Sequence, residues 1–130
     1  MRRVLDVLQE LCKVGERVVI FAQSPEQARF MGVRLGEELL CHILEGPSHR
    51  RCQILRSFHQ TEASSLICLV DEVDGMNLQC AAHIFFVYPA TSEVERRGLA
   101  TVCRLGQENE VKVHRFIAQG TPEEAAWGAQ

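Results

Sequence analysis

Two acidic residues that follow an apolar run are the first candidates for chemistry. Residues 66–70 are apolar enough for a buried strand, and Asp71 and Glu72 come directly after it. Such a pair can hold the magnesium ion of a nucleotide, but only beside a glycine-rich phosphate loop that ends in Lys-Ser or Lys-Thr. The only lysines, Lys13 and Lys112, both precede valine. The sequence therefore contains no phosphate loop, and solvated acids at a strand end are the favoured interpretation.

The cysteines and histidines offer a second kind of chemistry. Cys41, His42, His49 and Cys52 supply two sulfurs and two imidazoles, which suit tetrahedral zinc, but their spacing follows no zinc-finger pattern. We therefore expect no metal site. The six cysteines form no Cys-x-x-Cys pair, and several lie in apolar runs, which favours buried thiols in a reducing, intracellular compartment. A Gly-x-Ser-x-Gly nucleophile motif is also absent, so a hydrolase acting alone is not expected.

The elements that would position these residues alternate along the chain. Apolar spacing predicts a helix that Gly15 ends, and a serine cap followed by proline predicts a second helix from Pro25. Similar helix starts occur at Ser92 and Thr121, and strands are expected at 17–21, 66–70, 83–87 and 111–117. Alternation of this kind predicts an α/β fold in which helices cover both faces of a mostly parallel sheet. Ligands of such a fold gather at the carboxyl ends of the strands.

Length and composition limit the classes of protein. A chain of 130 residues with 46% hydrophobic residues is expected to form a single domain over residues 1–130. The formal net charge of −3 provides no global basic field, so any contact with nucleic acid must come from a local patch. No apolar run approaches the ~20 residues of a membrane span, and we expect a soluble, unsecreted protein without a membrane partner.

Two blocks in the second half of the chain combine a short polar turn with an apolar run. Residues 74–78, Asp-Gly-Met-Asn-Leu, precede the run from Ala81 to Val87, and residues 104–107, Arg-Leu-Gly-Gln, are followed later by Gly-Thr-Pro-Glu-Glu at 120–124. The first block is similar to the fifth helicase motif of the Swi/Snf-type ATPases of chromatin remodelling and DNA repair, in which a Gly-Leu-Asn-Leu turn precedes a strand. The second block resembles the sixth motif of the same family.

Two blocks in the first half agree in order with the same family. Residues 18–23, Val-Val-Ile-Phe-Ala-Gln, resemble the fourth motif, and Gly46, Arg51 and Phe58 resemble the block that follows it. The resemblance covers roughly residues 4–126. It implies a three-layer α/β/α RecA-like lobe, the C-terminal or second of the two lobes that close on ATP, with no phosphate loop of its own.

The resemblance also implies roles for individual residues. Arg104 would reach across the lobe interface to the transferring phosphate, and the residues implied in nucleotide binding are Asp74, Gly75, Arg104 and Gln107. The residues implied in DNA contact are Gln23, Ser48, Arg50, Arg51 and Asn77. For Arg104 the alternative is a cation near a helix C-terminus, and for the DNA set it is solvated surface. Arg50 and Arg51 are adjacent on a helix, so at most one is expected to face DNA.

ATP and magnesium would be cofactors only together with a first RecA-like lobe, which is the partner that the resemblance implies. Duplex DNA or a chromatin protein would be a further partner, and the expected location is the nucleus. Trp127 is expected to close the last helix onto the core rather than to anchor a partner.

The chain departs from the family pattern at several positions in the machinery. Thr101 replaces the first arginine of the sixth motif, and Arg97 replaces the glutamine before it. Glu72 and Val73 replace a Gly-Gly pair, and because valine cannot adopt the positive φ of glycine, the loop must take another path. Two hypotheses follow: a degenerate lobe that serves as a platform for DNA or protein, which we favour, or half of a DNA-dependent ATPase motor whose phosphate loop lies outside this chain.

Overall fold

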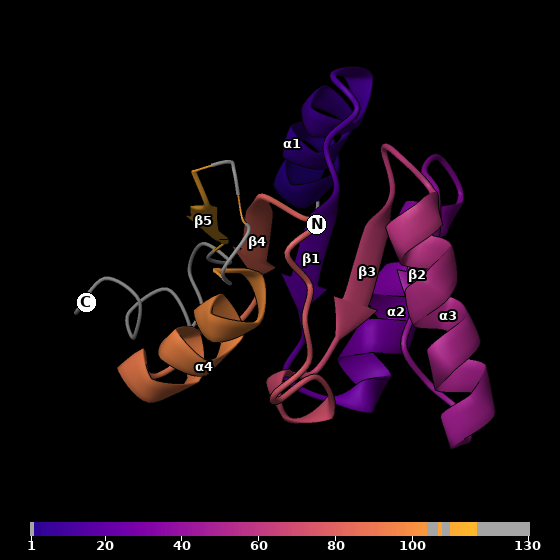
Figure 1. Ribbon diagram of the computed structural model, residues 1–130. Coiled ribbons are helices and arrows are strands. Elements are labelled where there is room, and N and C mark those ends of the chain that lie inside the picture. Colours follow the sequence, from indigo (N-terminus) through magenta and orange to yellow (C-terminus); the bar gives the residue numbers. More distant parts are fainter. Residues whose placement is uncertain (1, 104–106, 108–109, 117–130) are drawn as a thin grey trace.

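A parallel five-stranded sheet forms the centre of the molecule (Figure 1). The computed structural model describes residues 2–103, 107 and 110–116. Within them the strands are β1 (Val18–Phe21), β2 (Cys41–Ile43), β3 (Ser65–Cys68), β4 (His83–Phe86) and β5 (Lys112–Arg115), in the spatial order β2-β3-β1-β4-β5. The helices are α1 (Arg2–Lys13), α2 (Pro25–Gly36), α3 (Ser48–Gln60) and α4 (Ser92–Val102), with a 3-10 turn, η1 (Val70–Glu72), after β3.

Helices cover both faces of the sheet because the central strands are apolar on both sides. Side chains alternate along a strand, so Val18 and Ile20 point to the face that carries α1 and α2, whereas Val19 and Phe21 point to the face that carries α3 and α4. All four residues of β1, of β3 and of β4 are buried. The predicted three-layer α/β/α lobe with a parallel sheet is therefore confirmed.

The order of the strands creates a switch point at the carboxyl edge of the sheet. From β1 the chain passes through α2 to the β2 side, whereas from β4 it passes through α4 to β5 on the other side (Figure 1). Chains that diverge in this way leave a crevice at the carboxyl ends of the strands. The segments that follow β1, β3 and β4 meet at this edge, which is where the sequence predicted the functional residues.

Backbone angles and side-chain hydrogen bonds explain where the helices begin and end. Gly15, with φ of +79°, follows α1 as expected. The Ser24 hydroxyl accepts a hydrogen bond from the Gln27 amide at 3.2 Å and caps α2 as expected. At α4 the predicted cap, Ser92, is wrong by one residue. Thr91 caps this helix because its backbone is extended (φ −71°, ψ 162°) and its hydroxyl accepts from the Val94 amide at 3.2 Å.

Two strands differ from their predicted lengths, and one strand was missed. β3 ends at Cys68 rather than at residue 70, because the Glu72 carboxylate accepts a hydrogen bond from the Leu69 amide at 2.8 Å and the chain turns into η1. β5 spans Lys112–Arg115, inside the expected 111–117, and residue 117 lies outside the described part. β2 was not predicted. No helix in the described ranges is long and apolar enough to cross a membrane.

Candidate nucleotide and DNA edge

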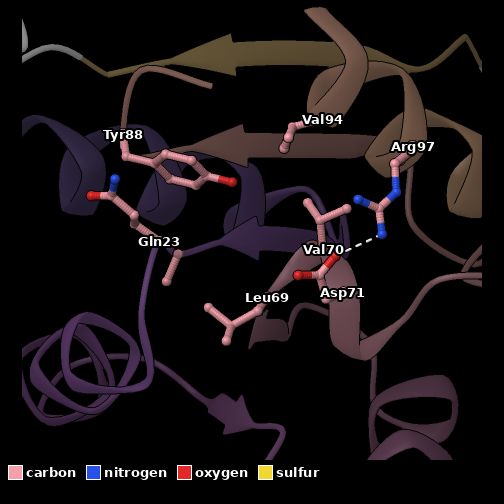
Figure 2. Close-up of a pocket in the computed structure, with 8 residues that line it drawn as sticks. Gln23, Leu69, Val70, Asp71, Tyr88, Val94 and Arg97 are labelled. Atoms are coloured by element: carbon pink, nitrogen blue, oxygen red, sulfur yellow. Dashed lines mark hydrogen bonds and ion pairs between the residues drawn. The ribbon is translucent and has the colours of Figure 1, made fainter. Parts of the chain in front are cut away.

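A small hollow lies at the carboxyl edge of the sheet, between the segments that follow β1, β3 and β4. Its volume is about 140 Å³. The lining residues are Ala22, Gln23, Leu69, Val70, Asp71, Tyr88, Val94 and Arg97. Figure 2 shows Tyr88 and Gln23 on one side of the hollow and Arg97 on the other, with Asp71 in contact with Arg97. The hollow is thus lined by four apolar and four polar residues.

Tyr88 is a member of this site that sequence reasoning missed. It follows β4, and its side chain is only 9% exposed. Burial raises the pKa of the Tyr88 phenol, and the nearby charge of Asp71 raises it further. The phenol therefore keeps its proton at neutral pH and acts as a neutral polar group. No motif marks Tyr88 in the sequence, because it reads as one more apolar residue at the end of a strand.

The loop after β3 takes the path that valine in place of glycine requires. Val73 has a negative φ of −116° and its side chain is fully buried in the core. The positive φ of this loop falls two residues later, at Gly75, with φ of +80°. Val73 therefore has a backbone angle that valine can adopt, and its core side chain anchors the loop.

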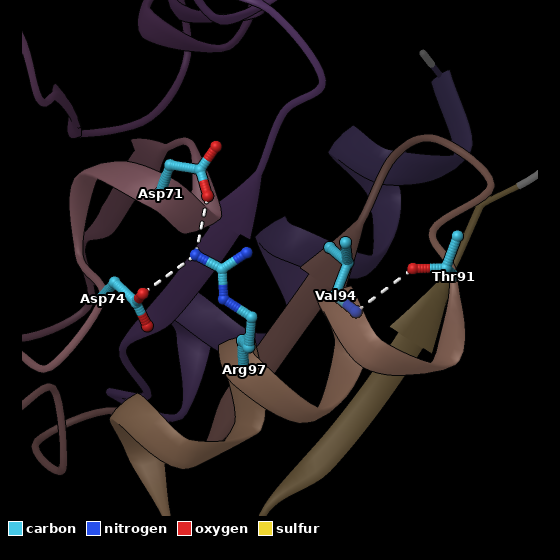
Figure 3. A network of polar contacts seen from close by, with 5 residues as sticks. All are labelled: Asp71, Asp74, Thr91, Val94 and Arg97. Carbon is cyan, nitrogen blue, oxygen red and sulfur yellow. Dashed lines mark hydrogen bonds and ion pairs between the residues drawn. The ribbon is translucent and has the colours of Figure 1, made fainter.

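Arg97 joins the loop after β3 to α4. Its Nη2 atom lies 2.6 Å from an Asp71 carboxylate oxygen and 2.9 Å from an Asp74 carboxylate oxygen (Figure 3). The hydrogen bond that the guanidinium donates to Asp71 is the largest cause that raises the pKa of Arg97 above its ordinary value, and the hydrogen bond to Asp74 is the next largest. One cation therefore bridges two carboxylates that come from the same loop. Asp74, predicted to bind nucleotide, takes part in this contact, and Gly75 beside it is exposed.

Two residues at sixth-motif positions make contacts inside the fold. Thr101 is 1% exposed and its hydroxyl donates to the Gly98 carbonyl at 2.7 Å. The amide nitrogen of the Gln107 side chain lies 2.9, 3.0 and 3.2 Å from the carbonyl oxygens of Gln79, Ala81 and Val102. Gln107, predicted to bind nucleotide, thus ties the end of α4 to the segment before β4.

Arg50 and Arg51, at the start of α3, point in different directions, as expected for adjacent residues of a helix. The Arg51 guanidinium donates to the Gly46 carbonyl at 2.8 Å and pairs with the Glu72 carboxylate at 3.1 Å. Arg50 is exposed, and its aliphatic carbons lie beside Gly46, where a Cβ atom would come within 2.8 Å of Arg50 Cδ. Arg51 is therefore an internal contact between α3 and η1, and Arg50 is the arginine that faces solvent.

Of the other predicted DNA residues, two lie at the carboxyl edge of the sheet and one lies in the connection to β4. Gln23 is exposed at the rim of the hollow, and its backbone amide donates to the Gln27 side chain at 2.7 Å. Ser48 is exposed at the first turn of α3. The Asn77 side-chain oxygen accepts from the Gln79 amide at 3.0 Å and so shapes its own turn. Gln23 and Ser48 thus follow the carboxyl ends of β1 and β2, on the edge of the sheet where Arg50 also lies. Asn77 lies in the connection to β4, where the Leu78 amide donates to the Thr101 carbonyl near the end of α4 at 2.7 Å.

The remaining sequence expectations concern metal and the end of the chain. Within residues 2–103, 107 and 110–116, no three or more His, Cys, Asp or Glu side chains are placed to hold a metal ion. Cys41 accepts a hydrogen bond from the Ser65 hydroxyl at 3.0 Å, and Cys52 is exposed on α3. All six thiols are free, and Cys68 is buried. Arg104, the helix start at Thr121 and Trp127 lie outside the described residues.

Similar proteins are DNA-repair and chromatin proteins, and no protein-family model matches the chain. DNA repair protein RAD5 of Candida glabrata is 30% identical over 134 residues, which covers 94% of this chain and 12% of that protein. DNA repair protein RAD5A of Arabidopsis thaliana is 28% identical over 93% of this chain and 12% of its own length. The chain thus spans about an eighth of these relatives.

A solved structure shares the fold. The crystal structure of the C-terminal part of the Fun30 ATPase domain superposes with a TM-score of 0.79 at 20% identity, over 93% of this chain and 43% of that one. The four motif-like blocks, the sequence relatives and the sheet order point to one assignment. This chain is a homologue of the RAD5 and SNF2 proteins and corresponds to the C-terminal RecA-like lobe of the Swi/Snf-type ATPases.

Proposed function

We propose that this lobe is a degenerate, rigid platform that binds DNA through its phosphates within a nuclear DNA-repair or chromatin factor, rather than half of a working motor. The observation that carries the proposal is the contact of Arg97 with Asp71 and Asp74. Where the family has glutamine and arginine, this chain has Arg97, which contacts two carboxylates of the same lobe, and Thr101, which lies in the core. Both side chains therefore make contacts within the lobe.

The charge of α3 supports DNA as the ligand of the platform. The helix contains no acidic residue, and Arg50 and Arg56 are exposed without an ion pair in the described part of the chain. At the same edge Asp71, Asp74 and Glu72 are each paired with a guanidinium, which reduces their repulsion of a phosphate backbone. Contacts to phosphates position a protein on DNA without reading its sequence.

Arg50→Ala is expected to weaken binding to duplex DNA about threefold in low salt, with a smaller slope of affinity against salt concentration, because one phosphate contact is lost. Fluorescence anisotropy with duplexes of two unrelated sequences measures both effects. Arg51 is not a suitable partner for this substitution, since its removal would also release Glu72 and the Gly46 carbonyl.

Arg34→Ala is the matched control, because Arg34 is exposed on α2 and lies on the opposite face of the sheet. Equal losses for the two variants would show that binding follows net charge and would remove α3 from the interface. Undetectable binding of the wild-type lobe would favour a protein partner for the platform.

The alternative function is half of a DNA-dependent ATPase, in which Arg104 completes the site of a phosphate-loop lobe outside this chain. For a platform we expect no DNA-stimulated ATP hydrolysis by the full-length natural protein, and the same basal rate in Arg104→Ala. A motor would instead show a stimulated rate that falls about three to five orders of magnitude when the arginine is removed. A phosphate-release assay with and without duplex DNA separates the two functions.

A further inference from the structure

Two histidines join the last strand of the sheet to its neighbour. His83 lies in β4 and His114 lies in β5, and their Nδ1 and Nε2 atoms are 3.1 Å apart. The ring centroids are 5.3 Å apart, and the Phe85 ring packs edge-on against His114 at 5.0 Å. His83 is only 7% exposed. The two imidazoles therefore form a hydrogen bond in a partly apolar setting.

This bond lies in the C-terminal half of a strand that has a single neighbour. β5 is at the edge of the sheet and pairs only with β4 among the described strands. The residue after His114, Arg115, also ties β5 to the rest of the lobe, because its guanidinium contacts the buried Glu95 carboxylate of α4 at 2.7 and 2.8 Å. The segment with the sixth-motif residues 104–107 leads directly into β5.

We propose that His83 and His114 form a proton-sensitive latch that holds β5 on β4 at neutral pH and releases it in acid. In a neutral pair, one ring N–H donates to the lone pair of the other ring. One added proton leaves such a bond possible, since an imidazolium can still donate to a neutral imidazole. With two added protons both facing nitrogens carry hydrogen, so the bond is lost and two cations oppose each other.

Burial and one nearby lysine favour the neutral state of the pair, and one nearby carboxylate opposes them. Glu16, from the connection between α1 and β1, lies 4.0 Å from the far nitrogen of His83 and favours one positive charge there. Lys112, from β5, disfavours a charge on either ring. Burial is the largest cause that lowers the pKa of His83, and also of His114, whose pKa the His83 charge lowers further.

The sign of the effect follows from these directions. A histidine whose pKa is lower in the folded strand than in the released strand takes up a proton when the strand opens. The stabilisation by the latch is therefore complete above the ordinary histidine pKa of about 6.5, and it is lost as the pH falls through the folded values. Release of β5 is expected to become about tenfold easier per pH unit in this window for each proton taken up.

Amide hydrogen exchange of the whole chain, followed by NMR from about pH 7.5 to about pH 5.5, spans this window. The reporters are the amides of Lys112 and Phe116, which donate to the Ala82 and Phe86 carbonyls at 2.8 and 3.0 Å. After correction for intrinsic exchange, their opening constants are expected to rise in acid relative to those of the β1 and β3 amides. An equal change in all strands, or none in β5, would overturn the latch.

His114→Gln tests whether protonation of the pair releases β5, because the glutamine side-chain amide can occupy the place of the His114 Nε2 atom but does not titrate. We expect β5 in this variant to lose most of its selective opening in acid. His59→Gln, at an exposed histidine of α3, is the control and should behave as the wild type does. Selective opening that persists in His114→Gln would contradict the proposal.

The histidine titration of the wild-type protein gives a test that needs no variant. Imidazole nitrogen shifts are expected to show His83 and His114 titrating as an interacting pair, both below the ordinary histidine pKa of about 6.5. Two independent titrations at the ordinary pKa would exclude the latch, even if His114→Gln failed to fold. Neither test depends on the proposed DNA function.

Discussion

Replacing Gly98 with valine is expected to lower the free energy of unfolding by about 2–3 kcal/mol, because the core at this point has no space for a side chain. A Cβ atom on Gly98 would lie 2.9 Å from a carbon of the Phe21 ring and 3.2 Å from a carbon of the Phe86 ring. These rings are buried and stack on each other with centroids 5.3 Å apart. Any added carbon must therefore push α4 away from the sheet.

Gly36→Val is the matched control for Gly98→Val. Gly36 ends α2, and nothing lies within 4 Å of its ideal Cβ position. Valine has a better helix propensity than glycine by a few tenths of a kcal/mol, so propensity alone would make both variants slightly more stable. Urea unfolding with an unchanged m-value measures the difference. Similar stabilities of the two variants would show that α4 moves freely away from Phe21 and Phe86.

Arg97→Glu is expected to weaken binding of the lobe to duplex DNA about tenfold in low salt, since two units of charge are changed beside the proposed phosphate contacts. The variant would place three carboxylates together where one guanidinium now neutralises Asp71 and Asp74. Repulsion among them should also loosen the loop after β3. Fluorescence anisotropy across a salt series measures the affinity, and limited proteolysis reports on the loop.

Asp74→Asn changes charge in the opposite direction and serves as the partner experiment. The Asp71 contact with Arg97 can remain in this variant, and the edge gains one unit of positive charge. We therefore expect DNA affinity equal to or higher than that of the wild type. A loss in both variants would mean that the shape of the loop, and not its charge, determines binding. Unchanged affinity in Arg97→Glu would place the DNA on another surface.

Most of the fold could be predicted because the central strands are unambiguous. β1, β3 and β4 are short apolar runs, each buried on both faces, and α2 and α4 begin at polar caps. β2 was missed because it has three residues, all half-buried, and too few side chains to show a pattern. The cap of α4 was shifted because Thr91 and Ser92 are adjacent residues that can both cap a helix, and the backbone angles identify Thr91 as the cap.

The position of the candidate site was predictable, but its contacts were not. The motif-like blocks placed the loops at one edge, and the sheet order agrees. The pairs Arg51–Glu72 and Arg97–Asp71 join residues 21 and 26 positions apart, so no local pattern indicates them. The sequence predicted Asp74, Gln107 and Arg51 as ligand-binding residues, and it did not predict the contact that each of them makes within the lobe. Mutual pairing of charges is decided by tertiary geometry.

The edge strand β5 also has a protective role. Its neighbour in the sheet is β4, whose sequence His-Ile-Phe-Phe is wholly buried and rich in residues that favour cross-β assembly. β5 covers the hydrogen-bonding edge of this apolar strand and presents Lys112 and Arg115, charged side chains that discourage the addition of strands from other molecules. A lobe that lost β5 would therefore expose a template for aggregation, so the contacts that retain this strand also keep the protein dispersed.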